Sequence, residues 1–177
     1  MVRCVRITCL SAAALIFMAA SALAQGPKGR SFGFGFEFGD PLAFTIRIWD
    51  SPKNSWDAAL GESFLGSPYI HADYLWNFPD AFNSNIVSLY AGIGAAVGFG
   101  EKNRYVFWYR GKGHDYWYYD DGDGHNGAAF AVKGAFGLDV IPRRSPLEIF
   151  FEVDPLLGVS PGFGFDFMVA LGLRFYP

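Results

Sequence analysis

Charged and titratable side chains alternate with large apolar ones along much of this chain, and such groups can pair as ions, transfer protons or line a path for cations. Acids outnumber bases among them, which would suit a cation path. The set comprises Glu37, Arg47, Asp57, His71, Asp73, Lys133, Asp139, Glu148, Glu152, Asp154, Asp166 and Arg174.

Two smaller groups suggest more specific chemistry. His71 and Asp73 are two residues apart, so they share a face of an extended segment and could act as a base and the carboxylate that orients it. Residues 120–127, DDGDGHNG, offer oxygen ligands for calcium. No Glu follows at the distance that a calcium loop requires. We therefore expect a solvated turn there, and no metal or cofactor.

The elements that position these groups are strands. In residues 163–176, FGFDFMVALGLRFY, every second residue is large and apolar, and small or charged residues stand between them. This period of two predicts a strand. The same pattern predicts seven more strands, over residues 31–39, 43–49, 55–64, 69–78, 86–100, 128–140 and 147–157.

The apolar face of these segments is long enough for a membrane, because about 9 to 11 tilted residues cross a bilayer. An apolar face combined with a face of Gly, Ala and charged residues suits a wall between lipid and a narrow polar interior. We therefore expect an all-β fold, an eight-stranded antiparallel up-and-down transmembrane β-barrel. The turns place both chain ends on the periplasmic side of the bacterial outer membrane.

Eight strands leave room inside for side chains and little else, so the charges should form an interior plug of ion pairs. A narrow cation-preferring channel is the alternative that the acid excess supports. A lipid-modifying enzyme with His71 as base is another, although no nucleophile pattern accompanies this residue. The expected pairs are Lys133 with Glu152 or Asp154, Arg174 with Glu148, and Arg47 with Asp57.

The first 24 residues are expected to be a cleaved helical signal peptide. Arg3 and Arg6 precede an apolar run, and an Ala-Leu-Ala cleavage site ends at Ala24. Both cysteines of the chain, Cys4 and Cys9, lie within this segment. The barrel domain then spans residues 25–177. With a formal net charge of −3 and no basic stripe, the chain is not expected to bind nucleic acid.

One long connection, residues 101–127, is expected to be an extracellular loop. Two β-prone runs flank Gly111-Lys112-Gly113 and predict a hairpin that prolongs the neighbouring strands. Exposed aromatic residues either pack on each other or bind a protein or a glycan. The candidate recognition residues are Tyr105, Phe107, Trp108, Tyr109, Tyr116, Trp117, Tyr118 and Tyr119.

Two stretches, His71-Ala-Asp-Tyr-Leu-Trp76 with Phe78-Pro-Asp80, and Pro146-Leu-Glu-Ile-Phe-Phe-Glu-Val153, resemble an uncharacterised family of small bacterial outer-membrane proteins. The fold is similar to the OmpA and OmpX type of eight-stranded barrel. The resemblance covers the chain from about Ser31, and it implies a fold and a location without implying any catalytic residue.

We expect a non-enzymatic, monomeric barrel with a role in envelope structure or in surface interaction through residues 101–127. Outer-membrane lipid is its expected partner. A secreted lipocalin-like binder is disfavoured, because the polar face of the strands combines Gly and Ala with charges and could not line a roomy apolar cup.

Overall fold

The computed structural model describes residues 29–100, 106–111, 114–119, 127–142, 145–160 and 163–177, with backbone only for the hairpin 106–119. The expected signal peptide lies outside these residues. The strands are β1 (Phe32–Asp40), β2 (Leu42–Ser51), β3 (Asn54–Ser63), β4 (Gly66–Phe78), β5 (Val87–Gly100), β6 (Val106–Gly111), β7 (His114–Tyr119), β8 (Gly127–Val140), β9 (Leu147–Ser160) and β10 (Gly164–Phe175).

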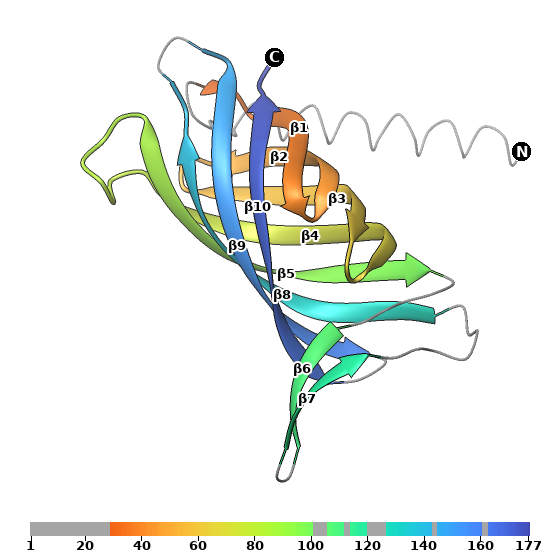
Figure 1. Cartoon of the computed structure of the whole chain (residues 1–177). Coiled ribbons are helices and arrows are strands. Elements are labelled where there is room, and N and C mark those ends of the chain that lie inside the picture. Colours follow the sequence, from red (N-terminus) through yellow and green to blue (C-terminus); the bar gives the residue numbers. More distant parts are fainter. Residues whose placement is uncertain (1–28, 101–105, 112–113, 120–126, 143–144, 161–162) are drawn as a thin grey trace, which may run out of the picture.

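Eight of these strands form a closed antiparallel barrel (Figure 1). Their order is β1-β2-β3-β4-β5-β8-β9-β10, and β1 closes the barrel by pairing with β10 from Phe34↔Phe175 to Asp40↔Val169. The expectation of an all-β, eight-stranded up-and-down barrel is therefore confirmed. The observed strand ends differ from the expected ones by a few residues.

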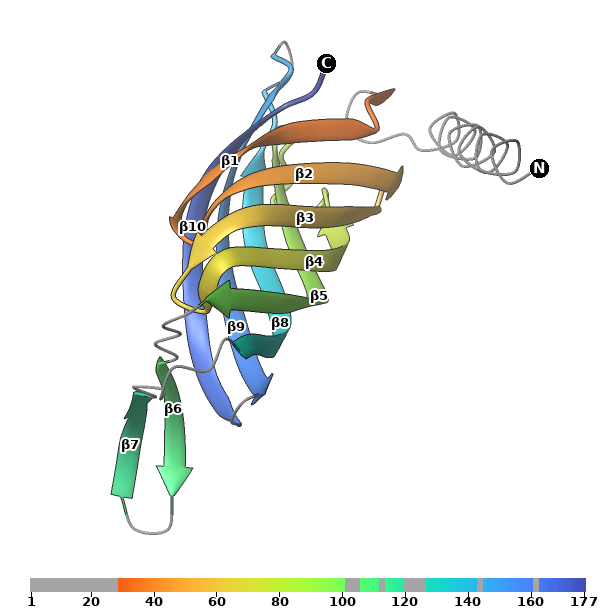
Figure 2. The same ribbon diagram turned by 90° about the vertical axis from the view of Figure 1, so that its right-hand side faces the viewer.

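β6 and β7 form a separate hairpin between β5 and β8. They pair antiparallel from Val106↔Tyr119 to Gly111↔His114, and the hairpin extends beyond the end of the barrel (Figure 2). The backbone of β6 also pairs with β10, at Trp108↔Phe165. Within the described residues the hairpin therefore lies beside β10 and pairs with neither β5 nor β8 (Figure 1), so the expectation that it prolongs these two strands is wrong.

The polarity of the barrel wall is the reverse of that in a water-soluble protein. On β1, Phe36 and Phe38 are 57% and 58% exposed, whereas Glu37 between them is 1% exposed. The same alternation runs along β10, where Leu171 is 54% exposed and Arg174 is 1% exposed. The strand periodicity therefore places apolar side chains outside and charged side chains inside.

Small residues on the inner face let the strands and their charged neighbours approach closely. A methyl group on Gly94 of β5 would collide with the carbonyl oxygen of Ala72 and with Oδ1 of Asp73 on β4. Gly94 thus makes room for the Asp73 carboxylate inside the wall.

Within the described part of the chain, no helix is long and apolar enough to cross a membrane.

Candidate functional site

The barrel interior consists of successive layers that β9 connects. Alternate residues of β9 point inward and are buried, from Leu156 near the loop end to Glu148 near the chain termini. Between them lie Asp154, Glu152 and Phe150, which are equally buried. Leu156 belongs to an apolar cluster, Asp154 and Glu152 contact Lys133, and Phe150 and Glu148 contact the arginines.

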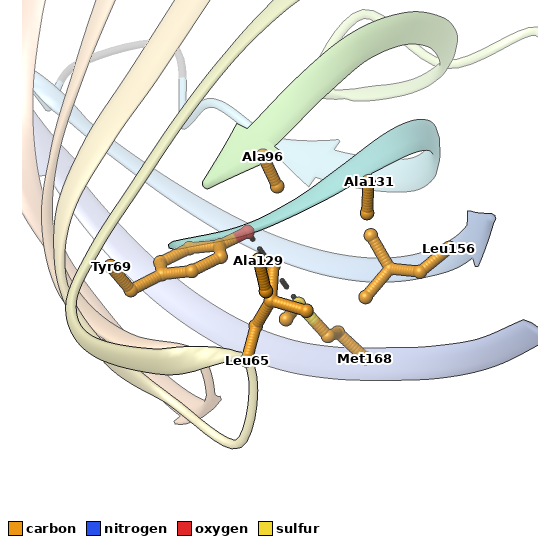
Figure 3. Close-up of a cluster of buried hydrophobic side chains, with 7 residues drawn as sticks. All are labelled: Leu65, Tyr69, Ala96, Ala129, Ala131, Leu156 and Met168. Atoms are coloured by element: carbon orange, nitrogen blue, oxygen red, sulfur yellow. Dashed lines mark hydrogen bonds between the residues drawn. The ribbon is translucent and has the colours of Figure 1, made fainter. Parts of the chain in front are cut away.

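An apolar layer occupies the end near the β3–β4 turn (Figure 3). Leu65, Tyr69, Leu156 and Met168 have no exposed surface, and small alanines of β5 and β8 complete the cluster. The Tyr69 hydroxyl lies 3.5 Å from Met168 Sδ. This layer separates the charged interior from the loop end of the barrel.

The next layer is centred on Lys133 of β8. Its ammonium Nζ donates to Asp73 Oδ2 at 2.7 Å and to Glu152 Oε1 at 2.8 Å, and lies 2.9 Å from Asp154 Oδ2. Tyr90 donates a further hydrogen bond to Glu152 Oε2 at 2.7 Å. Because Lys133 is fully buried, its charge is compensated entirely by these carboxylates.

His71 lies between this layer and the apolar one. Its Nδ1 is 3.1 Å from the Tyr69 hydroxyl, and its Nε2 is 3.7 Å from Asp73 Oδ2. The imidazole is 2% exposed. His71 therefore links Tyr69 to the Lys133 group through packing and polar contacts inside the wall.

Two arginines form the layer nearest the chain termini. Arg47 Nη1 donates to Glu148 Oε1 at 2.8 Å and to Asp139 Oδ2 at 3.2 Å, and its Nη2 bonds to Asn77 Oδ1. Its guanidinium also lies 4.6 Å from the centre of the Trp49 ring. Arg47 thus reaches across the barrel from β2 to β8 and β9.

Arg174 of β10 completes this layer. It donates to Glu148 Oε1 at 2.8 Å and pairs with Asp57 Oδ2 through Nη2. Its guanidinium stacks 3.7 Å above the Phe150 ring, and Thr45 accepts a hydrogen bond from its Nη2 at 3.0 Å. Glu148 is therefore shared between both arginines.

The termini end of the interior is closed by aromatic side chains. Trp49 donates from Nε1 to the Tyr176 hydroxyl at 3.2 Å, and Tyr176 in turn bonds to Glu148 Oε2. Arg30 donates to the Tyr176 carbonyl oxygen at 2.6 Å. Trp49 and Tyr176 are 3% and 4% exposed, so they cover the arginine layer.

The structure buries all but one of the charged residues singled out in the sequence. Asp166 is the exception: it is half-buried on β10, and its Oδ1 accepts a hydrogen bond from the Phe167 amide at 2.7 Å. The Lys133 pairs with Glu152 and Asp154, and the Arg174 pair with Glu148, are present.

The expected pair of Arg47 with Asp57 is wrong. These residues are directly opposite on β2 and β3, but Arg47 extends past Asp57 to Asp139 and Glu148. Asp57 instead pairs with Arg174 and accepts a hydrogen bond from Thr45 at 2.9 Å. The Arg47 side chain is long enough to reach two carboxylates across the barrel. Two charge-assisted hydrogen bonds stabilise this conformation more than a single contact with the residue on the adjacent strand would.

The candidate recognition residues of the loop lie on β6 and β7 or outside the described residues. Tyr105 and the segment 120–126 lie outside the described residues, and only the backbone of β6 and β7 is described. Among the described residues, no group of three or more His, Asp or Glu side chains is arranged to hold a metal ion.

The described interior is thus a set of charged side chains, most of them in ion pairs, between two layers of bulky side chains. This arrangement can rigidify the barrel, and it encloses His71, which is 2% exposed. In the comparisons with known proteins, no family model, curated protein or solved structure matches the chain.

Proposed function

We propose that the chain is a non-enzymatic integral protein of the bacterial outer membrane, whose rigid barrel displays the β6–β7 hairpin at the cell surface. The observation that carries this proposal is the reversed polarity of a closed barrel. Apolar side chains cover the outside of every barrel strand, and the buried charges lie inside.

Lipid is the solvent that suits such an outer surface. Soluble monomers rarely expose contiguous apolar patches above a few hundred Å². Here the exposed side chains surround the barrel, and they include Phe34 and Phe36 on β1, Ile93 on β5 and Phe167 on β10. A closed barrel also leaves no strand edge unpaired within the bilayer, which membranes require.

The packed interior favours an anchor over a channel or an enzyme. The apolar layer around Leu65 and Met168 lies across one end, and Trp49 and Tyr176 cover the other. Ions would have to displace several fully buried side chains to pass. The lipid-modifying alternative would need His71 to face the bilayer, and it faces the interior.

A surface role follows from the position of the hairpin. It joins β5 to β8 at the barrel end opposite the chain termini, and it extends beyond the barrel in Figure 2. With the termini in the periplasm, the hairpin would lie outside the cell. Its Tyr- and Trp-rich sequence suits contact with a protein or a glycan.

Membrane insertion is tested by fractionating cell envelopes and running the protein on a denaturing gel with and without boiling. We expect it in the outer-membrane fraction with a different mobility when unboiled, because a closed barrel resists detergent until it is heated. Recovery in the soluble periplasm, with one mobility under both conditions, would contradict the proposal.

The surface role predicts a distinct result for the hairpin. Replacing Tyr116, Trp117, Tyr118 and Tyr119 together by Ser should leave barrel assembly unchanged and remove adherence of the cells to protein-coated or glycan-coated surfaces.

Protease added to intact cells should cut within residues 101–127 and leave the barrel strands protected.

The matched control replaces outward residues of equal aromatic character on the barrel, Trp56 and Trp76, which should impair insertion instead. A hairpin variant that inserts normally and keeps every adherence property would show that the recognition role is wrong.

A further inference from the structure

The barrel interior holds more acid than its bases can neutralise. Among the described residues, seven carboxylic side chains are buried, against three side chains that carry a fixed positive charge, Arg47, Lys133 and Arg174. A buried carboxylate without a compensating charge is strongly unfavourable, because it loses its hydration. The interior must therefore acquire positive charge from elsewhere or hold some carboxyl groups in neutral form.

The three bases are already fully engaged by six of the seven carboxyl groups. Lys133 contacts three of them, and Glu148 is shared by both arginines. The remaining contacts join Arg47 to Asp139 and Arg174 to Asp57. Among the buried carboxyl groups of the described residues, Glu37 is the one that no described base contacts.

Glu37 lies on the inner face of β1 and is 1% exposed. Its cross-strand neighbours are Ala43 on β2 and Gly172 on β10, neither of which has a polar side chain. Its Oε1 is buried without a hydrogen-bond partner among the described residues. Polar atoms buried in this way usually have a partner, so an orphan atom indicates a missing ligand.

We propose that Glu37 is a proton-binding site, whose carboxyl group stays neutral in the folded barrel. A neutral carboxyl removes one buried negative charge and gains an O–H donor. This inference concerns the closed interior and holds whether lipid or water covers the outside of the barrel.

The groups that act on Glu37 come from several strands. Asp57 of β3 and Glu152 of β9 interact with it as carboxylates, Lys133 of β8 and Arg174 of β10 as bases, and Tyr69 of β4 as a neutral phenol. From β2, Thr45 is uncharged and Arg47 is engaged elsewhere. Burial disfavours a Glu37 anion most. Repulsion by Asp57 and Glu152 adds to this effect, and attraction by Arg174 and Lys133, which hold other carboxylates at ion-pair distance, offsets it only in part.

A metal ion is the competing ligand. It would need several oxygen atoms around it at once. Glu37 and its acidic neighbours do not form such a group among the described residues, since none is arranged for metal binding there. A proton needs only one oxygen, so it fits the geometry better.

The test measures the infrared spectrum of the refolded full-length barrel in deuterated buffer at neutral pH. The wild type should show the carbonyl band of a protonated carboxyl group, and Glu37→Gln should lose one carboxyl equivalent of it. Glu62→Gln is the matched control, because Glu62 is an exposed carboxylate on the outer face of β3, and it should leave the band unchanged.

The pH dependence of folding gives an independent measurement. If the folded barrel retains a proton that the unfolded chain releases, the folding equilibrium constant of the wild type should fall with rising pH by about an extra tenfold per unit relative to Glu37→Gln. Because Gln needs no proton to stay neutral, the Glu37→Gln variant should fold better than the wild type at neutral pH, and the two should converge below the ordinary pKa of a Glu carboxyl.

An unchanged carbonyl band in Glu37→Gln, with the same pH slope as the wild type, would overturn the proposal. It would equally be overturned if sodium, potassium or magnesium ions stabilised the wild type, and not Glu37→Gln, at constant ionic strength. That result would assign the missing positive charge to a metal ion.

Discussion

Replacing Lys133 by Met is expected to destabilise the barrel by about 3 to 5 kcal/mol, the cost typical of removing one partner from a buried ion pair. Met has a similar length and fills most of the same space, so little of the loss would come from packing. The loss would come from Asp73, Glu152 and Asp154, which would remain buried without the ammonium group that now lies within 2.9 Å of each.

A double-mutant cycle separates this charge effect from a general loss of packing. Lys133→Met combined with Glu152→Gln should be less destabilised than the sum of the single variants, because the second change removes one of the stranded charges. Urea titrations of refolding into detergent micelles would give the free energies. Lys53→Met in the exposed β2–β3 turn is the control and should change stability by no more than about 0.5 kcal/mol.

Additive losses for Lys133 with each of Glu152 and Asp154 would contradict the interior plug. They would show that the three side chains do not act as one group, whatever their distances in the folded barrel. A coupling of about 0.5 to 3 kcal/mol would support it.

The strands could be predicted from the sequence because their signal is local. On β5, Val87, Leu89, Ile93 and Val97 alternate with residues that are small except for Tyr90, and this alternation indicates which side chains face outward. An even number of such segments, joined by turns, is enough to suggest a closed barrel. The contact of β6 with β10 depends on how the long connection folds back, for which the period of the strands gives no information.

The interior pairs were predictable only between neighbouring strands. Lys133 and Glu152 lie on adjacent β8 and β9, and their pairing follows from the strand order. Asp73 reaches Lys133 from β4, and Asp57 reaches Arg174 from β3, so both contacts cross the interior. Such contacts depend on barrel diameter and side-chain length, which a one-dimensional pattern does not contain.

Glu37 shows a second limit of prediction from the sequence, which concerns whether a buried acid is paired. Its sequence pattern identifies an inward-facing acid, like Glu148 or Glu152, and nothing local distinguishes the three. Only the folded barrel shows that the bases are engaged by other carboxyl groups and that Glu37 stands opposite Ala43 and Gly172. Whether a buried acid is paired is therefore a property of the whole interior.

The proposed lipid around the barrel leads to the last large effect. Ile93→Arg should destabilise the barrel in bilayers by about 2 to 4 kcal/mol, and Phe99→Arg by about 0 to 1 kcal/mol. Both residues are on the outer face of β5, where Ile93 is 54% and Phe99 is 39% exposed. Ile93 is midway along the strand and Phe99 is near its end, so the added charge would be near the bilayer centre in one variant and near the interface in the other.

A water-exposed surface predicts no such excess loss at Ile93. In water, Arg at the more exposed Ile93 should be tolerated at least as well as Arg at Phe99, with changes of about 0.5 kcal/mol or less at both. Refolding titrations of the two variants into lipid vesicles would measure the difference. Equal and small losses at both positions would show that the outer face of β5 does not lie in a membrane; a loss at Ile93 that exceeds the loss at Phe99 would place the middle of the strand within the hydrocarbon layer.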